Sequence, residues 1–343
     1  MILAGGVGSR FWPVSTPERP KQLLPLGGER PLITETVERI LPLVPMPRLR
    51  ILTGDALAGR IHSVVPGLTR DNFLLEPHAK GTAPVLAWAA HEIARHDPEA
   101  IMVSLHADHV IEPASAFRDL IEEIGRLAAE RGRLYTIGIE PTRPETGYGY
   151  ISVGERLAPA TEVYEVADFV EKPDHDTALE YLRRGGFLWN SGIFIWRAAT
   201  LLEELRRHTP ELAPLLPLLD EGDIAAFFER APNLTIDEGL LERSDAVAVA
   251  RATFRWDDVG TWDAVGRTRP ADGRGNVHVG PAHLVDSDDC IVWSEDGDVV
   301  LFGTNDLVVV RSGGITFVAP RERTAELKTL LEQLPENVRR LES

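Results

Sequence analysis

The sequence contains a single cysteine, Cys290, among its 343 residues. One cysteine excludes an intrachain disulfide framework, and no Cys/His cluster with zinc-site spacing accompanies it. A nucleophilic role would need a histidine partner, and residues 288–291 suggest none, so we predict a packing role. No signal peptide precedes the first predicted strand, which together with the lone cysteine favours a cytoplasmic location.

Long apolar runs and excess positive charge are also missing. No run approaches the roughly 18 residues of a membrane-spanning helix. The net charge of −17 argues against nucleic acid or an acidic membrane as partner. Only four basic residues are lysine, namely Lys21, Lys80, Lys172 and Lys328, and the others are arginine. Three of these lysines lie in motif-like segments, as expected where a compact ammonium group must approach phosphate oxygens.

Strands and amphipathic helices alternate in the first part of the chain. This predicts an α/β fold with a Rossmann-like mixed, mainly parallel sheet and helices on both faces. More strands follow, and then helices over 198–243 that prolines break into short pieces. The predicted strands are 2–4, 49–53, 72–75, 100–105, 133–137, 148–153, 163–170 and 187–196, and the predicted helices are 33–41, 56–65, 82–96, 116–130 and 176–184.

Residues 268–276 are rich in proline and glycine and indicate a linker between two domains. We therefore expect a catalytic domain at 1–268 and a small β-rich domain at 276–343, which ends in a helix over 322–334. The strand at 2–4 is short for a central, buried strand. Either it is truly short or a few apolar residues precede it in a longer chain.

The amino-terminal segment carries the strongest chemical signal. The first strand leads directly into glycines at 5, 6 and 8, with Arg10 beside them and Lys21 eleven residues further on. Glycines after a strand let bare N–H groups approach a phosphate or a base, and the two cations supply charge for a polyphosphate. The spacing fits neither the P-loop nor the dinucleotide fingerprint. Ligands of such sheets bind at the carboxyl ends of strands, so the loops after Ala4 and Leu105 are expected to meet there.

Several segments, in a fixed order, resemble the signature of sugar-nucleotide pyrophosphorylases, specifically the mannose-1-phosphate guanylyltransferase branch. Leu23 and His106 depart from the residues common at their positions. The segments are GGVGSRFWP (5–13), PKQ (20–22), EPHAKGTAP (76–84), ADHVI (107–111), TGYGYI (146–151), FVEKP (169–173), NSGIF (190–194) and WDDVGTW (256–262).

The resemblance implies transfer of GMP from GTP to mannose 1-phosphate, giving GDP-mannose and pyrophosphate. A sugar phosphate is largely dianionic at neutral pH, so this in-line displacement needs no general base. It needs positioning and neutralisation of crowded phosphates by backbone amides, Arg, Lys and Mg²⁺.

The resemblance also implies roles for individual residues. Arg10 and Lys21 are the catalytic candidates that grip the triphosphate, and Asp108 and Asp258 would share Mg²⁺, with Asp257 as the competitor for Asp258. The predicted nucleotide-binding residues are Leu3, Ala4, Gly5, Gly6, Gly8, Ser9, Glu76, Pro77, Thr82 and Asp108, and the predicted sugar-phosphate-binding residues are Gly149, Glu171, Lys172 and Asn190.

Other interpretations of these residues stay open. Thr82 could be a helix N-cap, and Glu171 with Lys172 a solvated ion pair. His106 and His109 flank Asp108 and could form a zinc site, although packing or hydrogen bonding is the simpler role.

Two other functions are compatible with the pattern. One is thymidylyl or uridylyl transfer from dTTP or UTP to glucose 1-phosphate. The other is a non-catalytic sugar-nucleotide-binding subunit, which the presence of all the charged candidates disfavours. A small β domain with a terminal helix often packs on another subunit, so we also expect a homodimer.

Overall fold

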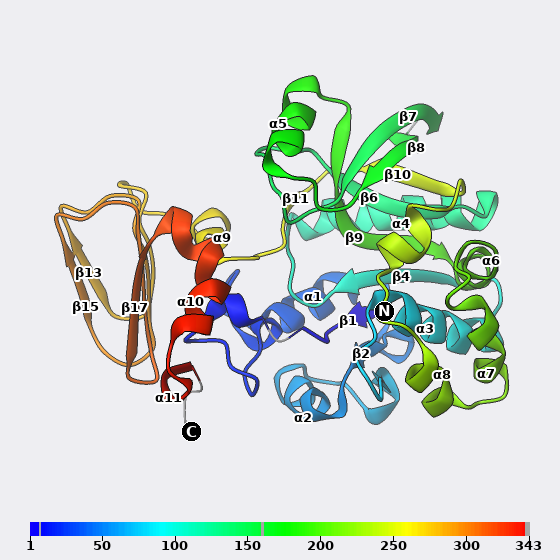
Figure 1. Cartoon of the computed structure of the whole chain (residues 1–343), viewed down its shortest axis with the longest axis horizontal. Coiled ribbons are helices and arrows are strands. Elements are labelled where there is room, and N and C mark those ends of the chain that lie inside the picture. The colour runs from blue at the N-terminus through cyan, green and yellow to red at the C-terminus, as the bar shows by residue number, and fades with distance from the viewer. Residues whose placement is uncertain (7, 159–160, 340–343) are drawn as a thin grey trace.

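The computed structural model describes residues 1–6, 8–158 and 161–339, without the side chains of Ser9 and Ala158. Figure 1 shows a main body built around one large sheet and a β-rich C-terminal lobe beside it. Within the described ranges, no helix combines the length and apolar character that crossing a bilayer requires.

The main body contains a nine-stranded sheet in the described part of the chain, in the order β3-β2-β1-β4-β9-β6-β10-β8-β7. Only β8 and β9 run against the other strands, so the prediction of a mixed, mainly parallel sheet is confirmed. The strands are β1 (Ile2–Leu3), β2 (Ile51–Thr53), β3 (Phe73–Leu75), β4 (Ile101–His106), β6 (Leu134–Ile139), β7 (Tyr150–Ala158), β8 (Val163–Val170), β9 (Phe187–Arg197) and β10 (Val247–Arg251).

Helices cover both faces of the sheet, as predicted. Successive strand residues point to opposite faces, so Ile2 packs in one apolar core and Leu3 in the other. The first core lies under α1 (Leu32–Ile40), α2 (Asp55–Val64) and α4 (Ala114–Arg131), and the second under α3 (Thr82–His96), α6 (Ala198–His208), α7 (Leu216–Asp220) and α8 (Ile224–Arg230). A further helix, α5 (His175–Arg184), lies near β7 and β8 (Figure 1).

Prolines break the segment after β9 into short helices, as the sequence predicts. Its last piece is a single π-helical turn at Asp237–Leu241. This turn places Asp237 next to the strand that carries Asn190, because Asn190 Nδ2 donates to Asp237 Oδ1 at 2.7 Å.

A two-stranded ribbon was not expected from the sequence. It pairs β5 (Val110–Glu112) antiparallel with β11 (Arg255–Asp257), with Val110 opposite Asp257. This register places the residues just outside the ribbon, at 108–109 and 258, at the same end.

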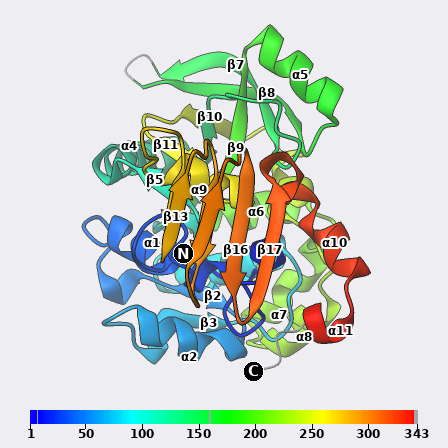
Figure 2. The same cartoon turned by 90° about the vertical axis from the view of Figure 1, so that its left-hand side faces the viewer.

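The C-terminal lobe is a stack of short, mostly parallel strands that packs on the amino-terminal loop. Phe11 contacts Trp262 with ring centroids 5.1 Å apart, and Trp12 contacts Phe317 at 6.1 Å. Helix α9 (Trp262–Thr268) precedes the lobe. The elements of the lobe are β12 (Val277–Val279), β13 (Ala282–Val285), β14 (Ile291–Ser294), β15 (Val299–Phe302), β16 (Leu307–Ser312), β17 (Ile315–Pro320), α10 (Leu327–Gln333) and α11 (Glu336–Arg339). Figure 2 views this lobe from its outer side.

The predicted helix at 322–334 is wrong in its first part. Residues Arg321–Glu326 form a 3-10 helix, and α10 begins only at Leu327. Cys290 is buried in the lobe, and its Sγ lies 3.3 Å from the Asp288 carbonyl oxygen, which agrees with a packing role.

Candidate active site

The glycine loop and the PKQ segment are built around each other. The carbonyl oxygen of Ala4 accepts hydrogen bonds from Gln22 Nε2 at 2.9 Å and from Thr53 Oγ1 at 3.1 Å. Gly8 has φ +68°, and a Cβ on it would lie 2.4 Å from Lys21 Cβ. Glycine at this position therefore lets the backbone pass directly over Lys21.

Lys21 joins the two carboxylate-bearing segments at the carboxyl edge of the sheet. Its Nζ donates to Asp108 Oδ2 at 2.7 Å and to the Asp258 carbonyl oxygen at 2.5 Å. The side chain is only 10% exposed. Burial alone would raise the pKa of Asp108, but the charge of the Lys21 ammonium and its hydrogen bond hold that pKa well below its ordinary range. Asp108 is therefore a fixed negative charge.

The two neighbouring aspartates, Asp257 and Asp258, have different surroundings. The Asp257 carboxylate is paired with Arg267, with Nε to Oδ2 at 2.8 Å, and accepts a bond from Val259 N. Asp258 instead faces the site and accepts from Tyr148 Oη at 2.5 Å. Burial raises the pKa of Asp258, and Asp257 adds to this, whereas Lys21 and Tyr148 lower it. A buried carboxylate in this setting gains from a nearby cation, which favours Asp258 over Asp257 as a ligand.

A pocket of about 310 Å³ opens beside the glycine loop. Glu76 lines it, with Oε1 so near Gly5 that a Cβ there would lie 3.1 Å away, and burial raises the pKa of the Glu76 carboxyl group. Pro77 is exposed and does not line the pocket. Among the predicted nucleotide-binding residues, those that line it are Leu3, Ala4, Gly5, Gly6, Glu76, Thr82 and Asp108.

Two of the predicted nucleotide-binding residues, Thr82 and Ser9, each begin a helix. Gly81, not Thr82, occupies the N-cap position of α3, so the interpretation of Thr82 as the cap is wrong. The Thr82 hydroxyl instead accepts a bond from Ile236 N at 2.8 Å. Ser9 begins a 3-10 helix that ends at Phe11, and its side chain lies outside the described residues.

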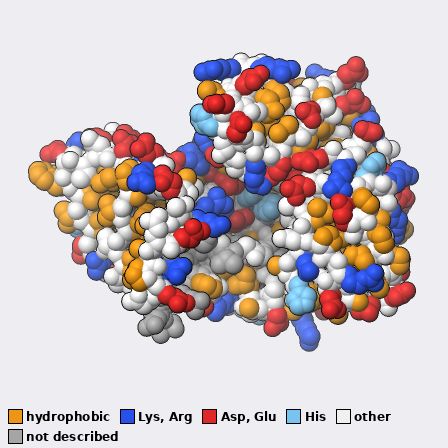
Figure 3. Space-filling model, in the orientation of Figure 1, with side chains coloured by type: hydrophobic (Ala, Val, Ile, Leu, Met, Phe, Trp, Pro, Cys, Tyr) orange, Lys and Arg blue, Asp and Glu red, His pale blue; other side chains and the backbone are white. Residues whose placement is uncertain are grey.

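Arg10 lines a second, larger pocket of about 830 Å³ between the main body and the C-terminal lobe. Asp258, Arg143 and Tyr148 line the same pocket, together with Arg321 from the lobe. Figure 3 shows a hollow between the lobe and the main body, with basic and acidic side chains along its walls. Basic and acidic side chains are thus mixed around Asp258, because Glu145, Asp263, Asp306 and Glu322 line the same pocket as the arginines.

The predicted sugar-binding residues also come together. A Cβ on Gly149 would lie 2.5 Å from Glu171 Oε2 and 3.4 Å from Asn190 Cβ, so glycine leaves room there. Lys172 follows β8 with φ +47°, an unusual conformation for lysine. It is 59% exposed, and its Nζ donates to Glu171 Oε1. The Glu171–Lys172 ion pair that we gave as an alternative interpretation is therefore present, and it lies beside Gly149 and Asn190.

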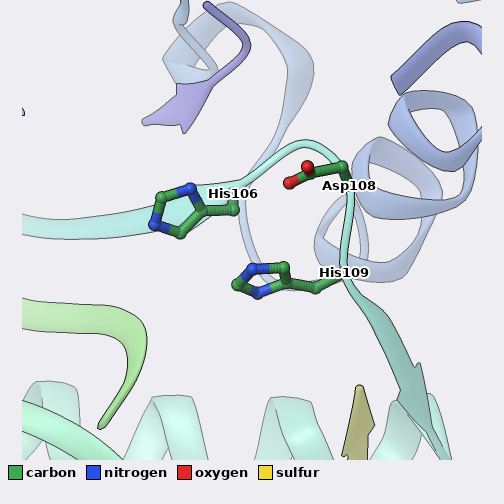
Figure 4. Close-up of side chains that lie close together, drawn as sticks. All are labelled: His106, Asp108 and His109. Atoms are coloured by element: carbon green, nitrogen blue, oxygen red, sulfur yellow. The ribbon is translucent and has the colours of Figure 1, made fainter. Parts of the chain in front are cut away.

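His106, Asp108 and His109 lie close enough to hold a metal ion, with ligand atoms within 4.8 Å of one another (Figure 4). However, His109 Nδ1 accepts a hydrogen bond from Trp256 Nε1 at 3.1 Å. Burial, with His106 close by, lowers the pKa of His109, so the ring is neutral and its Nε2 carries the proton. The ring therefore offers no free ligand atom, and the arrangement favours packing and hydrogen bonding over a zinc site.

Sequence reasoning missed three side chains of the site. Tyr148 connects Arg143 to Asp258, because it accepts from Arg143 Nη2 at 3.2 Å and donates to Asp258. Asp237 lies beside Asn190 and Glu171. The TGYGYI segment pointed to Tyr148, but no local pattern marks Arg143 or Asp237.

The surroundings of Asp237 predict how the free energy of unfolding depends on pH. Burial, with Glu171 nearby, raises its pKa from 3.8 to about 7. Between these values the folded protein holds a proton that the unfolded chain has lost. The free energy of unfolding should therefore fall as pH rises from about 4 to about 7 and then level off.

Asp237→Asn keeps an acceptor for Asn190 and removes this dependence. In urea denaturation the variant should exceed the unsubstituted protein at pH 8 by on the order of 2 kcal/mol, and the difference should vanish near pH 4. Asp176→Asn, at a fully exposed site, is the control and should show no such trend. Parallel curves for Asp237→Asn and the unsubstituted protein would contradict the assignment.

Comparison with known proteins agrees with this geometry. The nucleotidyl transferase family model matches residues 1–272, and a model of the MannoseP isomerase/GMP-like beta-helix domain matches residues 280–334. A mannose-1-phosphate guanylyltransferase of Escherichia coli is 35% identical over 352 residues, covering 99% of this chain and 74% of that protein. The chain belongs to the mannose-1-phosphate guanylyltransferase family. It is a nucleotidyltransferase, and enzymes of this kind generally use a divalent metal ion.

Two further relatives of this guanylyltransferase-family chain are similar over nearly its whole length. The alginate biosynthesis protein AlgA of Pseudomonas aeruginosa is 34% identical, over 97% of this chain and 71% of that protein. A crystal structure of mannose-1-phosphate geranyltransferase from Thermus thermophilus is 34% identical, covers 97% of each chain and has a TM-score of 0.89. The C-terminal lobe is thus shared with the solved relative.

Proposed function

We propose that this nucleotidyltransferase transfers GMP from GTP to α-D-mannose 1-phosphate. A phosphate oxygen of the sugar phosphate forms a bond to the α-phosphorus of GTP. The bond between the α- and β-phosphates breaks, and pyrophosphate leaves with its electron pair. The observation that carries the proposal is the junction at Lys21, which connects Asp108 in the small pocket of the glycine loop to Asp258 in the larger pocket that Arg10 lines.

The residues at this junction suit a reaction between two anions. We assign Lys21 and Arg10 to the phosphates of GTP, with backbone N–H groups of the glycine loop beside them. Lys21 is held in place before substrate binds, by its bonds to Asp108 and to the Asp258 carbonyl oxygen, so it can stabilise charge that develops on the phosphates without reorganising. Nothing at the junction needs to act as a base, because the attacking phosphate is already ionised.

The same junction fits a divalent cation. Asp108 uses Oδ2 for Lys21, and Asp258 uses Oδ1 for Tyr148. Each carboxylate keeps its other oxygen without a hydrogen-bond partner among the described residues. Hard carboxylate oxygens in small number suit Mg²⁺, which retains several waters. We propose Mg²⁺ as the ion; when bound it neutralises phosphate charge.

The small pocket supports guanine as the base. Glu76 provides carboxylate oxygens that accept hydrogen bonds, and guanine presents N–H donors on its N1 and N2. Thymine and uracil offer a single such donor. Residues 3–6 line the same pocket, and their backbone groups can complete the contacts.

Nucleotide competition tests this assignment. GTP, dTTP and UTP are each incubated with mannose 1-phosphate or glucose 1-phosphate, and released pyrophosphate is measured. We expect the pair of GTP and mannose 1-phosphate to turn over fastest. Turnover with dTTP or UTP but not with GTP would reject it in favour of the alternative transferases, and no turnover with any pair would indicate a non-catalytic subunit.

We assign the mannose 1-phosphate site to Gly149, Glu171, Lys172 and Asn190, with Asp237 added from the structure. Lys172→Ala should raise the KM for mannose 1-phosphate by roughly tenfold, because a charge-assisted contact to its phosphate is lost. The KM for GTP should change much less. Lys328→Ala, an exposed lysine on α10, is the control. An unchanged KM for mannose 1-phosphate in Lys172→Ala would refute the role.

The C-terminal lobe supports the expected homodimer. Its outer strands β13 and β15 expose Val285 (50%), Val300 (65%) and Phe302 (73%), and Val285 pairs with Phe302. Such a patch on a small protein suits a second copy of the chain. Light scattering should give twice the 37.8 kDa mass, and Phe302→Asp should shift it to one copy. A monomer-sized peak for the unsubstituted protein at all concentrations would overturn this.

The predicted domain bounds and the cytoplasmic location are also part of the proposal. We place the catalytic domain at 1–268 and the β-rich domain at 276–343, with residues 340–343 outside the described part. A cytoplasmic location fits an enzyme with one cysteine, which lies buried in the lobe.

A further inference from the structure

Four side chains of alternating charge run from the C-terminal lobe to the loop that carries Asp258. Arg321 donates from Nε and Nη2 to Asp263 Oδ1 at 3.0 and 2.8 Å. Arg267 donates from Nη1 to Asp263 Oδ2 at 2.5 Å, and from Nε to Asp257 Oδ2 at 2.8 Å. We call Arg321, Asp263, Arg267 and Asp257 the arginine–aspartate ladder.

The inner end of the ladder fixes the backbone around Asp258. Asp257 Oδ1 accepts a hydrogen bond from Val259 N at 2.8 Å, so the bond spans Asp258. Val259 is fully buried and has φ +48°, a conformation that β-branched residues rarely adopt. Such a backbone persists only where its surroundings hold it, and Asp257 is one of the groups that do so.

The outer end of the ladder is tied to the strands of the C-terminal lobe. Arg321 Nη1 donates to the Asp289 carbonyl oxygen at 3.0 Å, and its backbone N donates to the Asp306 carbonyl oxygen at 2.9 Å. Arg321 therefore cannot shift without disturbing two turns of the lobe. The position of the lobe is thus transmitted to Asp263 through a two-pronged ion pair.

The ladder is sheltered enough for these pairs to matter. The exposed fractions of its side chains are 23% for Arg321, 34% for Asp263, 29% for Arg267 and 12% for Asp257. Three of the four also line the 830 Å³ pocket next to Asp258. Partly buried ion pairs are screened less by solvent than exposed ones.

We propose that Arg321, Asp263 and Arg267 are positioning residues that act through Asp257 to orient the Asp258 carboxylate for the divalent cation. The proposal rests on the metal role assigned to Asp258 in the proposed function. It means that the C-terminal lobe contributes to metal affinity without touching the metal.

The test compares Arg321→Met with Arg323→Met, since Arg323 is exposed and its ion pair within the described ranges is with Glu326 in its own turn. Mn²⁺ is the probe, and its dissociation constant for the enzyme saturated with GDP-mannose is measured by electron paramagnetic resonance. Arg321→Met should raise this constant roughly tenfold, as loss of a group that orients a ligand typically does. Arg323→Met should leave it unchanged, as should the KM for mannose 1-phosphate in both variants.

Two further variants separate the ladder from general loosening of the lobe. Arg321→Met combined with Asp263→Asn should bind Mn²⁺ no more weakly than Arg321→Met alone, because both changes break the same connection. Leu327→Ala removes buried packing of α10 and leaves the ladder intact, so the Mn²⁺ constant should stay the same. Equal weakening by Leu327→Ala, or none by Arg321→Met, would overturn the proposal.

Asp258→Asn serves as the reference for the metal site itself. If it loses Mn²⁺ affinity and Arg321→Met does not, the ladder proposal alone fails. If Asp258→Asn keeps the affinity, the metal role of Asp258 fails and the ladder proposal falls with it.

Discussion

Asp258→Asn should lower kcat by roughly 100- to 1000-fold while the KM for mannose 1-phosphate changes little. Asparagine keeps an acceptor for Tyr148, so the fold of the loop should survive. It removes the negative charge at a buried position that lies beside Lys21 and the larger pocket. The measurement is pyrophosphate release at saturating GTP and mannose 1-phosphate, over a range of Mg²⁺ concentrations.

Asp245→Asn is the matched control, because Asp245 is exposed and lies outside both pockets. The control should retain full activity. If Asp258→Asn were as active as the control, Asp258 would have no part in metal binding, and the assignment of the metal site would have to be withdrawn.

Lys21→Met should reduce kcat/KM for GTP by on the order of 1000-fold. Methionine is close to lysine in length and fits the space under Gly8, but it cannot neutralise phosphate. It also leaves Asp108 without its ammonium partner and the Asp258 carbonyl oxygen without its donor. The two carboxylates would then repel each other and the phosphates, so substrate binding and chemistry should both suffer.

Steady-state kinetics with GTP as the varied substrate measure the change in kcat/KM, and thermal unfolding shows whether the variant folds. Lys328→Met, on the surface of α10, controls for loss of one positive charge from the whole chain. A Lys21→Met enzyme within threefold of the control would show that the ammonium group does not act on the nucleotide.

The longer helices and strands were predictable because each is long enough to show a period, whereas the three-residue strands of the β5–β11 ribbon were not. The helix at 82–96 was predicted with the bounds that the structure has, and the strand at 163–170 likewise. An apolar repeat of 3.6 or 2 residues is a property of a short stretch of sequence. A helix or strand can therefore be predicted from it without knowing which elements pack against it. The order of strands is not local, and the position of β9 between β4 and β6 followed only from the structure.

The site residues that belong to a sequence motif could be predicted. Those that tertiary packing brings to the site from distant parts of the chain could not. The glycine loop, Lys21 and Asp108 stood out by residue type and by their place after strands. Asp237 lies in a single π-helical turn with no periodic signal, and only tertiary packing brings it to Asn190. The final helix failed at its start for a similar reason. The sequence around Arg321 is compatible with a regular helix, but Arg321 instead bonds to two turns of the lobe and begins a 3-10 helix.

The ribbon of β5 and β11 has a consequence for how the enzyme is made. It brings together carboxylates that are 150 positions apart in the chain, so a ribosome needs about 8 to 30 s to deliver the second after the first. During that interval the nascent polypeptide holds half of the proposed metal site and no working centre. A translation product that stops anywhere before residue 258 would therefore be inert, however well its amino-terminal half folds.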